Sequence, residues 1–276
     1  MGKELELPQE FNALKQQYEA LQEELVKLAA KRETLLTTEK RSLETKYYLK
    51  IGRKQYQLYM LRNGVLRLRR KIEIIRAHLN RGEKYDLERV EKRLDEELKR
   101  WEEEVLELFQ KIRHAEYINK LPLLTPAEAS ELKSLFRELV RRLHPDLNKG
   151  LAEKDKHLWN RVLAAYDHGD LPELKTLALL VEDKEKSKES FTAIEELNIA
   201  TAKIKRQIEH LLQDLDKIGQ QFPFALREKL ANEAWIKEQH AEMEKQMSHY
   251  REQKLLYLSL LSDLTGNAGD SGALWH

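Results

Sequence analysis

The sequence predicts an all-α protein in which long coiled-coil helices flank a small helical hairpin module. Two observations predict this fold class. The 276-residue chain is 41% hydrophobic and 35% charged, which is too polar for one large globular core. Leucine and isoleucine nevertheless recur every three or four residues over most of the chain, and long amphipathic helices account for both observations.

The N-terminal arm is predicted to span residues 1–122, with three helical stretches and a turn near residues 80–84. The first stretch carries apolar residues in alternating steps of three and four, the pattern of a coiled-coil seam, and Arg32 fills one core position of that seam. A second seam covers residues 58–79 and ends at an Asn-Arg-Gly turn signal, and a third covers residues 87–112. The first seam consists of Phe11, Leu14, Tyr18, Leu21, Leu25, Leu28 and Leu35.

The hairpin module is predicted over residues 123–183. Pro145 lacks an N–H group and disfavours the α conformation at His144, so the first helix of the module must end there and expose Asp146 in a loop. A second helix is expected to fold back antiparallel, which makes this loop the tip of a hairpin. The apolar faces of the two helices are Leu132, Leu135, Phe136, Leu139 and Leu143, and Leu158, Trp159, Val162, Ala165 and Tyr166.

The C-terminal arm is predicted over residues 184–265, with a break near residues 222–223 where a Phe-Pro pair interrupts the pattern. Two stretches of similar length, residues 83–119 and 186–221, could pair antiparallel as a stalk. The outer helices could instead join two chains in a homodimer, because a narrow seam needs a partner, and both arrangements stay open. Residues 266–276 are rich in glycine and are expected to form a flexible tail.

Residues 40–81 form a basic segment with thirteen Lys or Arg residues and two acidic ones, although the whole chain has a formal charge of only +1. The cations could neutralise phosphates while interleaved tyrosines stack on bases, which predicts a candidate nucleic-acid interface. We favour the alternative that the acid-rich helix after Glu83 neutralises this segment, because its cations are spread around the helix. The candidate nucleic-acid-binding residues are Arg53, Lys54, Arg67, Arg69, Arg70 and Lys71.

The hairpin loop carries the tripeptide His144-Pro145-Asp146, with Phe136, Leu139 and Leu143 before it and with Asn148 and Ala165-Tyr166 after it. This arrangement resembles a J-domain, the module by which DnaJ-type co-chaperones engage the ATPase of DnaK-type chaperones. The resemblance covers about residues 124–180. The stretch before Thr125 lacks the Tyr-x-x-Leu-Gly sequence that opens the first helix of a J-domain.

The resemblance implies that the partner is a DnaK-type chaperone. It implies that the tripeptide contacts the chaperone and triggers ATP hydrolysis, while arginines of the preceding helix meet an acidic surface. The chemistry is consistent, because an exposed carboxylate can bind a partner arginine through a charge-assisted hydrogen bond and a basic helix face steers encounter. The implied chaperone-binding residues are His144, Pro145, Asp146, Arg137, Arg141 and Arg142.

Missing motifs exclude several other classes of function. The chain has no cysteine, which rules out disulfides, cysteine nucleophiles and cysteine-rich zinc modules. It has no phosphate-binding Gly-x-x-x-x-Gly-Lys motif, and its nine histidines show no metal-ligand spacing. We therefore expect no enzyme activity, cofactor or metal. No apolar run approaches the roughly 18 residues of a membrane span, so we expect a cytoplasmic protein without membrane contact.

These observations favour a co-chaperone or adaptor that recruits and stimulates a DnaK-type ATPase, with coiled-coil arms that bind a client or partner. Two alternatives stay open. The chain could be a rod that binds nucleic acid through residues 40–81, or a scaffold whose arms assemble a larger complex around an inert module.

Overall fold

The computed structural model describes residues 3–148, 150–182 and 194–266, and within these ranges it contains helices and no strand, which confirms the predicted all-α class. The chain divides into two compact units. Unit 1 comprises Met1–Leu43 and Pro122–Ala225, and unit 2 comprises Glu44–Leu121 and Leu226–His276. Each unit is therefore built from two separate stretches of chain.

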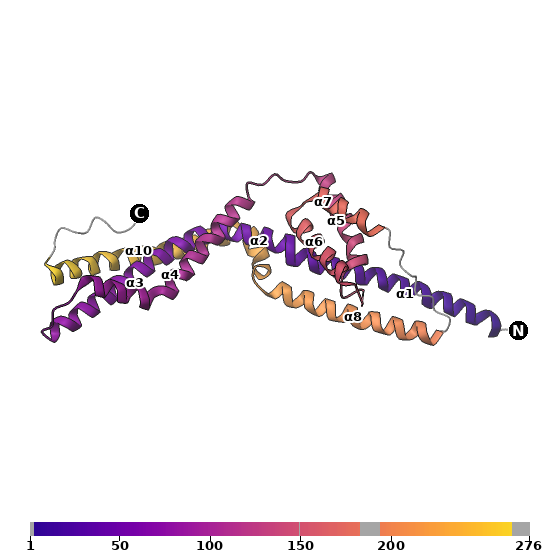
Figure 1. Ribbon diagram of the computed structural model, residues 1–276, viewed down its shortest axis with the longest axis horizontal. Helices are drawn as coiled ribbons and strands as arrows, with labels where there is room; N and C mark the ends of the chain where they lie inside the picture. Colours follow the sequence, from indigo (N-terminus) through magenta and orange to yellow (C-terminus); the bar gives the residue numbers. More distant parts are fainter. Residues whose placement is uncertain (1–2, 149, 183–193, 267–276) are drawn as a thin grey trace. The chain divides into compact units, whose positions relative to one another are not determined.

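Unit 1 contains α1 (Lys3–Thr34), a π-helical turn η1 (Leu35–Glu39), α5 (Pro126–Leu143), α6 (Glu153–His168), α7 (Leu171–Glu182) and α8 (Ile194–Gln220). One apolar core joins all of these helices. Figure 1 shows α8 lying along α1, while α5, α6 and α7 form a separate group that packs against α1. The core includes Tyr18, Leu25, Phe136, Val162, Leu174, Leu197 and Ile208.

Local sequence explains where the helices of the hairpin begin and end. At the start of α5, Glu128 accepts a hydrogen bond from the Thr125 backbone N–H (2.8 Å) and Thr125 Oγ1 accepts one from the Glu128 N–H (3.3 Å), a capping box completed by Pro126 in the first turn. The helix ends at Leu143, as the following His-Pro pair predicts. Gly169 ends α6 in the left-handed conformation, with φ of 71°.

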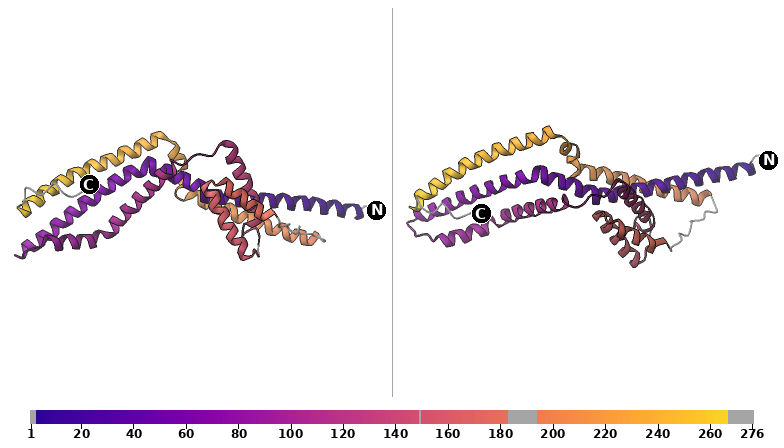
Figure 2. Two further views of the ribbon diagram at one scale, coloured as in Figure 1. Left: turned by 45° about the horizontal axis from the view of Figure 1, so that its top comes forward. Right: turned by 90° about the horizontal axis from the view of Figure 1, so that it is seen from above.

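Unit 2 contains the second half of α2 (Lys40–Tyr47), a second π-helical turn η2 (Tyr48–Gly52), α3 (Arg53–Asn80), α4 (Leu87–Ile118), α9 (Arg227–Ala231) and α10 (Glu233–Thr265). A 3-10 turn η3 (Phe224–Leu226) precedes α9. Helix α3 packs against both α4 and α10, as the views in Figure 2 show. The predicted turn near residues 80–84 is present, and Asp86 caps α4 by accepting a hydrogen bond from the Glu88 N–H (2.9 Å).

The packing partners of the long helices differ from the predicted ones. The stalk considered for residues 83–119 and 186–221, one of two arrangements left open, is not what forms, because α8 packs along α1 and α4 packs along α3. The predicted arm over residues 1–122 is likewise divided, since its first 43 residues belong to unit 1. Apolar side chains of α1 and α8 share one core, so the seam of α1 packs against a helix that is distant in the sequence.

Two further predictions concern the ends of the C-terminal arm and the membrane. The predicted break near residues 222–223 agrees with the end of α8 at Gln220. The predicted tail lies outside the described residues except for Gly266, which caps α10. Among the described residues, no helix is both long enough and apolar enough to cross a membrane.

Candidate protein-interaction site on the helical hairpin

Stacked aromatic rings hold the two helices of the hairpin together below its tip. The ring of Phe136 on α5 stacks on Tyr166 of α6, with centroids 3.7 Å apart, and on Trp159, with centroids 6.2 Å apart. All three side chains are buried. Burial raises the pKa of the Tyr166 phenol, whose oxygen lies 3.1 Å from Thr34 Oγ1 of α1. The loop between α5 and α6 is therefore mounted on a packed base.

His144 is a core residue of this tip, with only 2% of its surface exposed. Its ring meets Trp159 edge to face at 5.1 Å. Its Nδ1 atom accepts a hydrogen bond from the Asp146 backbone N–H at 3.1 Å, and its carbonyl oxygen accepts hydrogen bonds from the N–H groups of Leu147 (3.1 Å) and Asn148 (3.0 Å). The loop thus folds around His144, whose imidazole faces the protein interior.

Asn148 closes the C-terminal end of α5. Its Nδ2 atom donates hydrogen bonds to the carbonyl oxygens of Arg141 (3.2 Å) and His144 (3.1 Å). Carbonyl groups in the last turn of a helix lack partners within the helix, and a side-chain donor satisfies them. The asparagine of the motif therefore has a structural role in shaping the loop.

Pro145 and Asp146 are the exposed part of the tripeptide. The Asp146 side chain is 62% exposed, and its Oδ2 atom lies 3.6 Å from Arg32 Nη1 of α1. Its backbone carbonyl accepts a hydrogen bond from Gln207 Nε2 of α8 at 3.3 Å. The backbone of Asp146 is therefore fixed at both its N–H and its C=O, while most of the carboxylate faces solvent.

The α1 residues beside the loop are functional candidates that the sequence reasoning missed. Glu33 is buried, with 8% of its surface exposed, and its Oε1 atom lies 3.4 Å from His144 Nε2. Arg32 Nη1 donates to the same Glu33 oxygen at 3.0 Å. The available signal was Arg32 itself, because a charged residue in a core position of an apolar seam calls for a buried partner.

The three arginines assigned to this face by resemblance have different surroundings. Arg141 forms an ion pair with Glu23 of α1, and Arg142 pairs with Glu138 one turn earlier on α5 at 2.8 Å. Arg137 is exposed, as is Lys133 one turn before it. The basic face of α5 is thus partly engaged by α1 and partly open to solvent.

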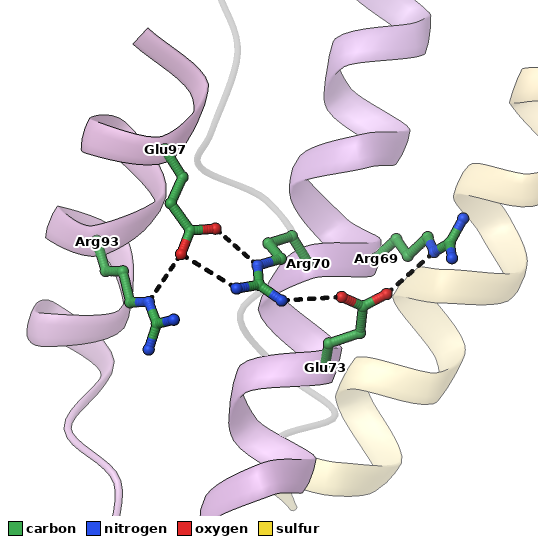
Figure 3. A network of polar contacts seen from close by, with 5 residues as sticks. All are labelled: Arg69, Arg70, Glu73, Arg93 and Glu97. Atoms are coloured by element: carbon green, nitrogen blue, oxygen red, sulfur yellow. Dashed lines mark hydrogen bonds and ion pairs between the residues drawn. The ribbon is translucent and has the colours of Figure 1, made fainter.

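The second candidate site, the basic segment of residues 40–81, is extensively paired with carboxylates inside unit 2. Figure 3 shows part of this network, in which Arg70 and Arg93 both bind Glu97, at 2.6 and 2.8 Å, and Arg69 binds Glu73 at 3.1 Å. The hydrogen bonds from Arg70 and Arg93 lower the pKa of Glu97 to about 2.

The remaining nucleic-acid candidates also contact carboxylates. Arg67 lies within 3.3 Å of three of them, two at 2.5 and 2.6 Å. The other pairs are Arg53 with Glu116 (2.9 Å), Lys54 with Glu244 (2.9 Å) and Lys71 with Glu91 (2.6 Å). This pairing supports the interpretation that unit 2 neutralises its basic segment internally. Among the described residues, no group of His, Asp or Glu side chains is arranged to hold a metal ion.

Comparison of the chain with protein-family models, with curated proteins and with solved structures found no match. The function of the hairpin must therefore be inferred from its own geometry and chemistry.

Proposed function

We propose that this protein is a J-domain-like co-chaperone or adaptor, which recruits a DnaK-type chaperone and stimulates its ATPase. The observation that carries this proposal is the division of the tripeptide at the hairpin tip. His144 is buried and holds the loop, whereas Pro145 and Asp146 are exposed on it. The helices outside the hairpin would then bind the client or partner that is delivered to the chaperone.

The exposed groups fit a partner that carries an arginine and an acidic patch. The Asp146 carboxylate can accept charge-assisted hydrogen bonds from a guanidinium group, and its backbone is already fixed. Lys133 and Arg137 extend along the exposed side of α5 and would steer an acidic surface toward the loop. The protein itself would supply no catalytic group; it would regulate the ATPase of the chaperone.

His144 takes an indirect role in this proposal. The resemblance alone implies that the histidine contacts the chaperone, yet its ring is packed against Trp159. We therefore assign the contact to Pro145 and Asp146 and assign His144 to holding the loop that presents them.

Steady-state ATP hydrolysis by a DnaK-type chaperone from the same source tests the proposal. The wild-type protein is compared with Asp146→Asn, which preserves shape and removes the charge. Asp216→Asn on α8 is the matched control, because it changes an exposed aspartate of the same unit away from the loop. We expect the wild type and the control to stimulate hydrolysis and Asp146→Asn to lose most of that stimulation. Equal rates with and without the wild-type protein would refute the proposal.

A scaffold with an inert hairpin is the second candidate function. The observation that favours it is that α1 already engages three of the implied chaperone-binding residues: Glu23 meets Arg141, Arg32 meets Asp146, and Glu33 meets His144. A scaffold would keep its partner complex after Asp146→Asn and would leave the chaperone's ATPase rate unchanged. Affinity purification of the wild type and of Asp146→Asn under the same conditions, combined with the ATPase assay, distinguishes the co-chaperone function from the scaffold function.

A further inference from the structure

We propose that Glu33 of α1 is the positioning residue of the hairpin loop. It holds the imidazole of His144 in the tautomer that accepts the Asp146 N–H, and through this bond it fixes the backbone that presents the Asp146 carboxylate. The consequence for a chaperone rests on the proposed function, whereas the positioning itself does not. Glu33 lies in the N-terminal stretch of the chain, outside the region that resembles a J-domain.

The hydrogen bond from the Asp146 backbone shows which tautomer His144 adopts. A backbone N–H can only donate, so Nδ1 of His144, which lies 3.1 Å from the Asp146 nitrogen, must carry a free lone pair. A neutral imidazole with a free Nδ1 carries its proton on Nε2. That Nε2–H faces Glu33 Oε1 at 3.4 Å, and a carboxylate oxygen can only accept. The protonated Nε2 thus faces a hydrogen-bond acceptor, and the unprotonated Nδ1 faces a hydrogen-bond donor.

The opposite tautomer would place a donor against a donor at Nδ1 and an acceptor against an acceptor at Nε2. A proton on Nδ1 would face the Asp146 N–H, and a lone pair on Nε2 would face the carboxylate of Glu33. Because His144 is buried, water cannot satisfy these groups in place of the protein. The carboxylate at position 33 therefore selects the histidine tautomer on which the loop depends.

Glu33 is itself held in place by its neighbours. Arg32 Nη1 donates to Glu33 Oε1 at 3.0 Å, which balances the charge of the buried carboxylate. On either side along α1, Ala30 is buried in the core of unit 1 and Thr34 Oγ1 lies 3.1 Å from the Tyr166 hydroxyl. The position of the carboxylate is thus set by the packing of α1 on the hairpin.

Two observations indicate that α1 supports the hairpin loop and does not cover the Asp146 carboxylate. The Asp146 side chain is still 62% exposed beside α1, and Arg32 Nη1 is 3.6 Å from it, which is longer than a hydrogen bond. Helix α1 also buries Tyr18, Leu25 and Val26 in the shared core, so its release would expose large apolar side chains. Helix α1 is therefore an integral part of the hairpin module. Between the end of α4 at Ile118 and the start of α5 at Pro126, the chain forms no helix.

NMR of full-length protein labelled with nitrogen-15 at histidine and aspartate tests the tautomer, with His144→Gln identifying the signals of the His144 ring and Asp146→Asn identifying the Asp146 amide. We expect the Nε2–H tautomer in the wild type and in Glu33→Gln, which keeps an acceptor oxygen. In Glu33→Leu, which has no acceptor, we expect the His144 ring signals to shift and the Asp146 amide to exchange faster with solvent. An Nδ1–H tautomer in the wild type would overturn the proposal even if the variants failed to fold.

The same variants give a functional readout in the chaperone ATPase assay. Glu33→Leu is expected to raise the protein concentration for half-maximal stimulation several-fold, Glu33→Gln to restore most of the loss, and Glu24→Leu, at an exposed position of α1, to have no effect. Equal half-maximal concentrations for all four proteins would contradict the positioning role. If the wild type itself gives no stimulation, the proposed function fails, and the tautomer and amide-exchange measurements alone decide the positioning.

Discussion

The buried and exposed residues of the tripeptide should respond differently to mutation. His144 contacts Trp159 and Glu33 in the core, so His144→Ala leaves a cavity and removes one of the two donors that face the buried Glu33 carboxylate. We expect a loss of stability of about 2–4 kcal/mol. Asp146→Ala removes a largely exposed side chain and should cost less than about 0.5–1 kcal/mol. Urea unfolding of both variants measures the contrast, and equal midpoints would show that His144 is not a core residue.

At the surface of unit 2, the network around Glu97 predicts a dependence of stability on pH. Its pKa is lowered from 4.5 to about 2, chiefly by the hydrogen bond from Arg70. The folded state therefore binds a proton here less readily than the unfolded state does. The stabilisation from Glu97 is fully present above pH 4.5, and it is lost as the pH falls from there toward about 2.

Thermal melting of the wild type and of Glu97→Gln measures this effect. The wild type should melt at the higher temperature at pH 6, and the difference should shrink steadily below pH 4.5. Salt should also reduce the difference, because the network is exposed. A melting-temperature difference that stays constant down to pH 2 would contradict the assignment.

Sequence reasoning at single positions succeeded where one residue controls the local backbone. Pro145 correctly predicted the end of α5 and the exposure of Asp146. The burial of His144 could not be predicted, because it depends on Trp159 and on Glu33, which lies more than one hundred residues away. Rules based on neighbouring residues cannot identify a residue that is distant in the sequence and covers the ring in the folded protein.

Helix α1 carries a buried alanine at a position where the core leaves little room for a larger side chain. Ala29 is 0% exposed in the core of unit 1. Ala29→Leu should therefore overpack the core and cost about 1–3 kcal/mol. Ala20→Leu on the exposed side of the same helix should change stability by less than about 0.5 kcal/mol. Chemical unfolding of both variants compares them, and similar losses would mean that helix propensity rather than packing determines the result.

Helix boundaries followed from the sequence better than helix partners did. The His144-Pro145 pair marks the end of α5, and the Phe-Pro pair at residues 222–223 follows the end of α8, as expected. An apolar seam shows that one face of a helix is buried, but it does not identify the helix that buries it. For this reason the sequence could not identify α1 as the partner of α8, and the coiled-coil packing of the long helices stays a prediction.

Taken as a whole, the molecule has a hairpin module that depends on distant segments. Unit 1 joins Met1–Leu43 to Pro122–Ala225 in one core. A fragment of residues 122–182 would lack α1 and α8 and would leave Phe136 and its neighbours partly uncovered. We expect this fragment to be much less helical than the same residues in the full chain, as measured by circular dichroism.

A matched fragment makes the comparison sharper. Residues 1–43, added as a separate peptide, should restore part of the helicity if α1 completes the core. A peptide carrying Ala29→Leu should restore less. Full helicity and a cooperative melt for residues 122–182 alone would show that the hairpin folds without α1.

The two-part construction of unit 1 also sets the order of events during synthesis. Residues 1–43 leave the ribosome well before residues 122–225, which supply the rest of the core of unit 1. At a translation rate of about 5–20 residues per second, roughly 10–40 s pass between the synthesis of residue 43 and that of residue 225. Until then, the apolar face of α1 lacks part of the core that buries it. During that time Tyr18, Leu25 and Val26 are available to other newly made chains. Until residues 122–225 have been made, the folded core that buries this face of α1 cannot be completed.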